Sequence, residues 1–207
     1  MNCELLGWPS DGPKLRLDHE RFSYAGKFVM TNTGKAVARN ADGDVVAAAS
    51  FNEDRTDERT LWIRYVTVDR DRRGEGIGPE LLALVRERAL SRGYDRLRIA
   101  VNNPFAYEAL YRTGFGYTGE TTGIAELLLE YPPPLERGDR SEEASPGVTN
   151  ADGDAGAVSN RDESDDDARR ERYRAGLEEF RERELSDAEE SFLESRRGRR
   201  PPETDTG

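Results

Sequence analysis

The chain has 207 residues, a length that suits one domain of ordinary size with an appendage. It carries 42 acidic and 31 basic side chains and a single cysteine, Cys3, which excludes an internal disulfide and a cysteine-rich zinc site. No apolar run approaches the length of a membrane-spanning helix, and the first residues lack the pattern of a secretory signal. We therefore expect a cytoplasmic protein that has no membrane partner.

The negative charge is concentrated in the last third of the chain. Residues 132–207 contain 22 acidic residues and 13 arginines, a net charge of −9, whereas residues 1–131 have a net charge of −2. Nucleic-acid phosphates require a basic surface, so we expect no nucleic-acid partner.

Residues 1–131 predict a domain of alternating strands and helices. Residues 28–30 and 36–38 flank a Thr-Asn-Thr-Gly turn and predict a hairpin. The later elements are expected as strands at 45–51, 61–68, 97–101, 117–118 and 124–130, and as helices at 79–92 and 105–112. Antiparallel strands that lead into a strand–helix–strand unit predict an α/β fold with a mixed, mostly antiparallel central sheet and helices on both faces.

Three consecutive prolines, Pro132 to Pro134, mark the end of this domain. Residues 132–167 are rich in Asp, Glu, Ser and Gly and have almost no large apolar side chain, so they predict a disordered acidic linker.

Residues 168–207 predict an amphipathic helical tail with a disordered end. Tyr173, Leu177 and Phe180 are spaced as one face of a helix, and Ser186 to Glu189 has the pattern of a capping box. The apolar face is narrow, which favours a weakly helical, solvated tail. The alternative is a helix that docks on its own domain or on a partner.

The most informative segment lies between the predicted strand at 61–68 and the predicted helix at 79–92. Its sequence, Arg73-Gly74-Glu75-Gly76-Ile77-Gly78, allows backbone N–H groups to approach a ligand closely. The helix that begins at Pro79 adds unpaired N–H groups and the positive end of its dipole. This pattern predicts a site for a phosphate-bearing ligand. The segment lacks the Gly-Lys-Ser/Thr of a P-loop and the third glycine of a Rossmann motif.

Two signatures in register resemble the GNAT superfamily of acetyl-CoA-dependent N-acetyltransferases. Residues 73–78 fit its Q/R-x-x-G-x-G/A signature, and Asn103, a short helix and Gly114-Phe115 fit its second signature. The resemblance covers roughly residues 20–131 and implies an acyl-CoA N-acyltransferase-like fold. It also implies transfer of acetyl from acetyl-CoA, as co-substrate and without a metal, to a primary amine of a small molecule or a protein.

The resemblance also implies which residues hold the coenzyme. The backbone of residues 73–78 would bind the pyrophosphate, which gives the candidates Arg73, Gly74, Gly76, Ile77 and Gly78. The strand that carries Val66 and Val68 would splay from the 97–101 strand, and its unpaired backbone groups would bind the pantetheine arm. Asn103 would face the same arm.

Catalytic positions depart from the family pattern. Arg64 stands where many members have a Glu, and it either binds a substrate carboxylate or is a solvated strand residue. Glu53 is the predicted base, acting through water. Leu110 occupies the position of the usual Tyr acid, so Tyr107 and Tyr111 are the candidate acids; the alternative is that both pack on the sheet.

The N-terminal helical pair that usually walls the acceptor site in this family is not evident in residues 1–27. We expect an acceptor site that is open, is completed by a second subunit of a homodimer, or is covered by the C-terminal helices. Two alternative functions remain: a non-catalytic coenzyme A-binding module, and a scaffold whose acidic tail recruits a partner.

Overall fold

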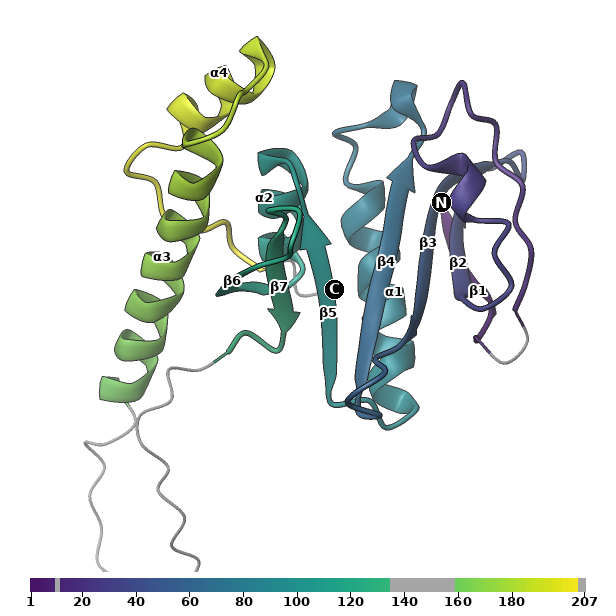
Figure 1. Cartoon of the computed structure of the whole chain (residues 1–207), viewed down its shortest axis with the longest axis horizontal. Coiled ribbons are helices and arrows are strands. Elements are labelled where there is room, and N and C mark those ends of the chain that lie inside the picture. Colours follow the sequence, from purple (N-terminus) through teal and green to yellow (C-terminus); the bar gives the residue numbers. More distant parts are fainter. Residues whose placement is uncertain (10–11, 135–158, 205–207) are drawn as a thin grey trace, which may run out of the picture.

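The computed structural model describes residues 1–9, 12–134 and 159–204, and the side chains of these except 159–164. Seven strands form one sheet in the order β1-β2-β3-β4-β5-β7-β6 (Figure 1). Their bounds are β1 Asn2–Gly7, β2 Gly34–Arg39, β3 Val45–Glu53, β4 Thr60–Val68, β5 Arg96–Val101, β6 Gly116–Thr121 and β7 Leu127–Tyr131. The β4–β5 pair is parallel and the other pairs are antiparallel. The predicted α/β fold with a mixed, mostly antiparallel sheet is confirmed.

The helices connect and cover the strands. They are the 3-10 turns η1 Ala25–Lys27 and η2 Arg70–Arg72, and the α-helices α1 Ile77–Ser91, α2 Pro104–Arg112, α3 Ser159–Arg181 and α4 Asp187–Ser195. None of the helices within the described ranges is long and apolar enough to cross a membrane.

Helix α1 packs on one face of the sheet through a stripe of Leu81, Val85 and Ala89. These residues recur every fourth position and therefore lie on one side of the helix. Opposite them the strands β2 and β3 carry small side chains, which are Ala36, Ala38, Ala47 and Ala49. Small residues let the helix lie close to the sheet, so the loop before α1 is held firmly to the end of β4.

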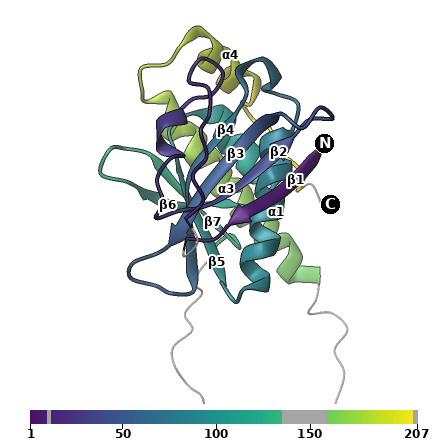
Figure 2. The same cartoon turned by 90° about the vertical axis from the view of Figure 1, so that its right-hand side faces the viewer.

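The opposite face of β2 and β3 is covered by the segment 12–33. Phe28, Val37 and Ala48 form a second buried cluster there, and Figure 2 shows this N-terminal segment and α1 on opposite sides of the strands. Within described residues 12–33 the helical structure is η1 alone. This face is thus covered by an irregular segment, and not by the N-terminal helical pair that the resemblance would imply.

The predicted hairpin between 28–30 and 36–38 is wrong. Phe28 is fully buried as a cover for the sheet, and β2 pairs instead with β1 and β3. The turn before β2 is fixed by the buried Lys35, whose Nζ donates to the carbonyl oxygens of Met30 at 2.6 Å and Thr33 at 3.0 Å. Of the two predicted strands, residues 36–38 do lie in β2, whereas in residues 28–30 Phe28 packs on the sheet and Val29 and Met30 are exposed.

The C-terminal helices belong to the core. Tyr173, Leu177, Phe180 and Leu193 are buried in the same cluster as α1 and the strands, and α3 lies along β6 at the edge of the sheet (Figure 1). The favoured prediction of a solvated tail is therefore wrong, and the alternative of docking on its own domain is what the structure has. Large aromatic side chains compensate for the narrow apolar face.

Helix α3 begins at Ser159, earlier than the predicted start of the tail at 168. Residues 159–167, expected as part of the disordered linker, are helical. The rest of the predicted linker, at 135–158, lies outside the described residues. The capping box is confirmed, since the backbone N–H of Ser186 donates to Glu189 at 3.0 Å.

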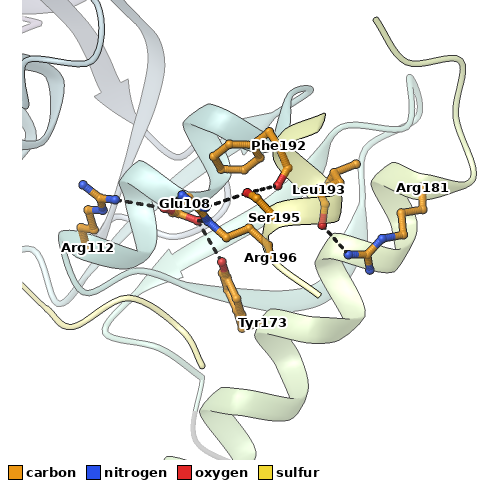
Figure 3. Close-up of polar contacts among 8 residues, drawn as sticks. All are labelled: Glu108, Arg112, Tyr173, Arg181, Phe192, Leu193, Ser195 and Arg196. Atoms are coloured by element: carbon orange, nitrogen blue, oxygen red, sulfur yellow. Dashed lines mark hydrogen bonds and ion pairs between the residues drawn. The ribbon is translucent and has the colours of Figure 1, made fainter. Parts of the chain in front are cut away.

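A buried ionic network joins α2 to the C-terminal helices (Figure 3). The Glu108 carboxylate on α2 accepts hydrogen bonds from Arg196 at 2.8 Å, from the Tyr173 hydroxyl at 3.1 Å and from Arg112 at 3.0 Å. Burial alone would raise the pKa of Glu108, but these donors, with Arg196 foremost, hold that pKa below its usual value of 4.5.

Candidate functional site

The loop between β4 and α1 exposes glycine backbone on an open side. Gly74 and Gly76 have φ of 85° and 82°, values that side-chain-bearing residues rarely adopt. No described heavy atom lies within 4 Å of where a Cβ would stand on either glycine. A ligand can therefore approach the backbone at both positions.

Helix α1 begins in this loop without a side-chain cap. Gly76 is the N-cap residue and makes no side-chain hydrogen bond, so the N–H groups of Ile77 and Gly78 point out of the first turn. The position of Cβ on Gly78 lies 3.5 Å from Val68, which packs the helix start on the end of β4. The helix start thus offers donors and a positive dipole end to an anion.

The segment before these glycines, residues 69–73, is anchored to the covering segment 12–33. Asp69 caps η2 by accepting from the backbone N–H of Asp71 at 3.2 Å, and it accepts from Arg21 Nε at 2.9 Å. Burial would raise the pKa of Asp69, but the hydrogen bonds from Arg21 and Asp71 outweigh it and lower that pKa. Arg73 reaches the same covering segment through Ser23, at 2.9 Å. The loop is thereby fixed to residues 12–33.

Strands β4 and β5 separate next to this loop. Their parallel pairing runs from Thr60–Arg96 to Ile63–Ile99 and then stops, although both strands continue (Figure 1). Beyond Ile63, the side of β4 that faces β5 has no strand partner in the described chain. Val66 and Val68 lie in this unpaired part. Their backbone groups can pair with an extended, amide-bearing ligand, as an added strand does.

Asn103 follows the end of β5, as the loop follows the end of β4. Because the two strands are parallel, both features lie at the same edge of the sheet. The side-chain oxygen of Asn103 caps α2 by accepting from the backbone N–H of Ala106 at 2.9 Å. Its side-chain NH₂ donates to Asn102 at 3.3 Å. The structure therefore brings together, at the β4–β5 opening, every residue that was predicted to hold the coenzyme.

The family model described as the acetyltransferase (GNAT) family matches residues 4–117, more than half of the chain. The chain belongs to the GNAT family of acetyltransferases. No functionally curated protein matches it.

Several solved structures are similar to this GNAT protein. Nourseothricin acetyltransferase is 27% identical over 49% of this chain and 66% of its own, with a TM-score of 0.44. A ribosomal-protein-alanine N-acetyltransferase from Brucella melitensis is 25% identical over 47% and 67%, with a TM-score of 0.42. A phosphinothricin acetyltransferase from Sinorhizobium meliloti, in complex with AcCoA, is 19% identical over 48% and 60%, with a TM-score of 0.44. The chain spans about two thirds of the length of these proteins.

The two tyrosines predicted as GNAT acids are buried under the C-terminal helices. Tyr107 has no exposed surface and Tyr111 has 1%. The Tyr107 hydroxyl contacts the carbonyl oxygens of Arg172 and Tyr173 at 3.2 Å, and the Tyr111 hydroxyl accepts from the backbone N–H of Tyr117 at 3.0 Å. Desolvation raises the pKa of both tyrosines. Both hydroxyls are engaged by backbone groups of α3 and β6 and are shielded from solvent, which favours the alternative that both are packing residues.

Glu53, the predicted base, is not brought to the opening. It pairs with Leu61 in the part of β4 that is still bonded to β5. Its carboxylate accepts from the Tyr94 hydroxyl at 2.8 Å, on the α1 face of the sheet. Along β4, Leu61 precedes Ile63, where the opening begins, by only two residues or about 7 Å. The direction of the Glu53 carboxylate toward Tyr94 on the α1 face, and not distance along the strand, keeps it from the opening. Within the described ranges no group of three His, Cys, Asp or Glu side chains is placed to hold a metal ion.

Sequence reasoning missed residues on the face opposite α1. Tyr24 has a left-handed backbone, with φ 60° and ψ 19°, and its ring lies 5.5 Å from that of Tyr65 on β4. Ser50, the cross-strand neighbour of Tyr65, is buried, and its hydroxyl has no hydrogen-bond partner among the described residues. Tyr24 carries no sequence signal because a left-handed conformation is typical of Gly or Asn, not Tyr.

Proposed function

We propose that this GNAT protein transfers the acetyl group of acetyl-CoA to the primary amine of an acceptor. One observation carries the proposal: the open glycine loop, the uncapped start of α1 and the unpaired edge of β4 meet at one edge of the sheet. Family membership supports the identity of the donor.

The pyrophosphate and the pantetheine arm of the coenzyme each match one group of backbone donors and acceptors at this edge of the sheet. Its pyrophosphate would accept hydrogen bonds from the backbone N–H groups of Gly76, Ile77 and Gly78. Its pantetheine amides would pair with the backbone of Val66 and Val68, so that the thioester lies near Ile63, where β4 and β5 part. When the acceptor amine and the thioester are both bound at this point, the attack of the nitrogen on the thioester carbon gains the rate advantage of an intramolecular reaction.

The amine must lose its proton before it attacks. Since the Glu53 carboxylate is bound by the Tyr94 hydroxyl on the α1 face, we propose that the amine is deprotonated by solvent rather than by that carboxylate. The rate should then rise with pH and level off above the pKa of the acceptor amine itself. Acceptors of different amine pKa, assayed across pH, test this.

A non-catalytic coenzyme A-binding module is the second candidate. It is favoured by the burial of Tyr107 and Tyr111, which removes both predicted acids from the opening. Calorimetry with acetyl-CoA, coenzyme A and ATP tests the shared premise, because absence of coenzyme A binding excludes both candidates. Thioester consumption over a broad panel of amines separates them: tight binding without acetyl transfer supports the module.

A further inference from the structure

Arg64 occupies a bulge at the point where β4 leaves β5. Tyr65 pairs with Ser50 and Ile63 pairs with Phe51, so Arg64 is an extra residue in β4 with no partner on β3. It also directly follows Ile63, the last residue of β4 that pairs with β5. Bulges of this kind redirect a side chain and are frequent next to active sites. The bulge therefore places Arg64 beside the expected position of the thioester.

The Arg64 side chain is held in place by neutral groups. Its Nε donates to the Asn52 side-chain oxygen at 2.6 Å, and its guanidinium carbon lies 4.8 Å from the centre of the Trp62 ring. A guanidinium has five N–H donors, so its two terminal nitrogens still present four. Asn52 and Trp62 are cross-strand neighbours on the face opposite α1, and this is the face that the guanidinium reaches.

Arg64 differs from other arginines of the sheet in having no carboxylate contact among the described residues. Arg98 binds Glu130 at 2.7 Å and Arg39 binds Glu4 at 2.6 Å. The nearby Asp54 instead accepts from Thr56, at 2.8 Å from its backbone and 2.7 Å from its hydroxyl. Desolvation lowers the pKa of Arg64 and outweighs the opposite effect of the Asp54 charge, which forms no ion pair with it among the described residues.

Aromatic rings lie beside this cation on the same face. Tyr65 follows Arg64 in β4, and the ring of Tyr24 from the covering segment contacts the ring of Tyr65 while Tyr24 stays 52% exposed. The left-handed backbone of Tyr24 is costly for a bulky residue, and such strain is concentrated at ligand-contacting positions. A cation stacked on Trp62, on the same face as Tyr65 and the exposed Tyr24, suits a ligand with an anionic group on an apolar body.

We propose that Arg64 binds a carboxylate of the acceptor, and that the acceptor is a small primary amine with a carboxylate on an apolar or aromatic body. This inference rests on the proposed function. The planar fork of an arginine matches a carboxylate with two parallel hydrogen bonds. The amine nitrogen then forms a bond to the acetyl carbon, the carbon–sulfur bond breaks to release the thiolate of coenzyme A, the amine proton leaves to solvent, and the thiolate takes a proton from solvent. The products are the N-acetyl carboxylate and coenzyme A.

The test uses the full-length protein and a matched pair of probes, para-(aminomethyl)benzoate and its carboxamide. Calorimetry in the presence of coenzyme A measures binding, and acetyl transfer from acetyl-CoA gives kcat and KM. We expect the wild type to prefer the carboxylate by about 10- to 100-fold, the range for a charge-assisted hydrogen-bonded pair. R64Q should abolish this preference through KM, R64K should restore part of it, and binding of the carboxamide should not change.

Arg55→Gln is the control, since it removes a nearby charge from the exposed β3–β4 turn. Equal binding of the two probes by the wild type overturns the inference, and so does a carboxylate preference that survives in R64Q. Failure of the proposed function has a different signature, namely no affinity for coenzyme A. In that case the preference of the coenzyme-free protein for the carboxylate, and its loss in R64Q, still decides the role of Arg64.

Discussion

Glu108 and Arg196 are 88 positions apart in the chain and form the ionic contact that fastens the C-terminal helices to α2. The contact is bidentate along one edge of the guanidinium, because Nε binds one carboxylate oxygen and Nη2 binds the other. The Glu108 side chain is 7% exposed and that of Arg196 is 20% exposed. Hydrogen bonds between charged groups in such surroundings are stronger than those at the surface.

Glu108→Gln should destabilise the fold by about 2 kcal/mol, because it leaves a partly buried guanidinium without its counter-ion. Chemical denaturation measures this, and a double-mutant cycle with Arg196→Gln isolates the pair. The matched control is Glu194→Gln. Its ion pair with Arg197 is two-thirds exposed on both sides and should be worth less than about 1 kcal/mol. Equal effects of the two substitutions would contradict the assignment of Glu108 as the anchor.

The same pair predicts a dependence of stability on pH. The pKa of Glu108 is lower in the folded chain than its usual 4.5. Its stabilisation is therefore present above pH 4.5 and is lost as the pH falls through the folded pKa. The difference in unfolding free energy between wild type and Glu108→Gln should shrink as the pH falls from 7 to 3. Thermal unfolding over this range measures it, and a constant difference would refute the linkage.

Gly176→Ala should destabilise the protein, although Ala is normally the better helix former by about 1 kcal/mol. A Cβ on Gly176 would stand 2.7 Å from Cε2 of Tyr107 and closer still to its hydroxyl. Tyr107 is fully buried and cannot move aside, so the overpacking should cost about 1–3 kcal/mol. Denaturation of the single variants and of Gly176→Ala with Tyr107→Leu tests this, since the smaller side chain should relieve the clash.

Tyr107→Phe should leave acetyl transfer within about twofold of wild type and should cost about 1 kcal/mol of stability, the usual value of a lost hydrogen bond. The hydroxyl contacts the backbone of α3 rather than the opening. A general acid would behave differently, because its removal lowers kcat by about 10²–10⁴-fold. Steady-state kinetics beside denaturation distinguishes these outcomes.

Gly76→Val should weaken coenzyme A binding by at least about tenfold, since the new side chain fills the open side over the first turn of α1. The matched control is Gly43→Val. Gly43 has a similar φ of 87° and equally open surroundings, but it lies in the β2–β3 turn. Both variants carry the same backbone strain, so only a loss confined to Gly76→Val supports the pyrophosphate site. Calorimetry with coenzyme A makes the comparison.

The elements around the glycine loop were predicted well because local signals dominate there. Helix α1 was expected at 79–92 and lies at Ile77–Ser91, and the strand expected at 61–68 is β4, Thr60–Val68. Glycines, a proline and an apolar run with helical spacing set these boundaries without help from the rest of the chain.

The predictions that failed concern elements whose structure depends on contacts with residues far away in the sequence. Strand β1 was not predicted, because its pairing with β2 depends on residues some thirty positions later. The docking of Tyr173 against Tyr107 depends on a stacked ring pair, 5.8 Å apart, between residues that are 66 positions apart in the chain. The burial of Tyr107 and Tyr111 follows from that docking, so a reading of α2 by itself could not assign their roles.

The position of α3 along β6 limits how this protein can be shortened. The family match ends at residue 117, and β7 ends at Tyr131. A chain cut after β7 would uncover the rings of Tyr107 and Tyr117 and the outer edge of β6, where α3 now lies. Bare strand edges beside aromatic surface promote self-association. Precipitation of a truncated chain would therefore result from the exposed edge of β6 and would not reveal the role of the tail. Substitutions within the C-terminal helices are the better way to test that role.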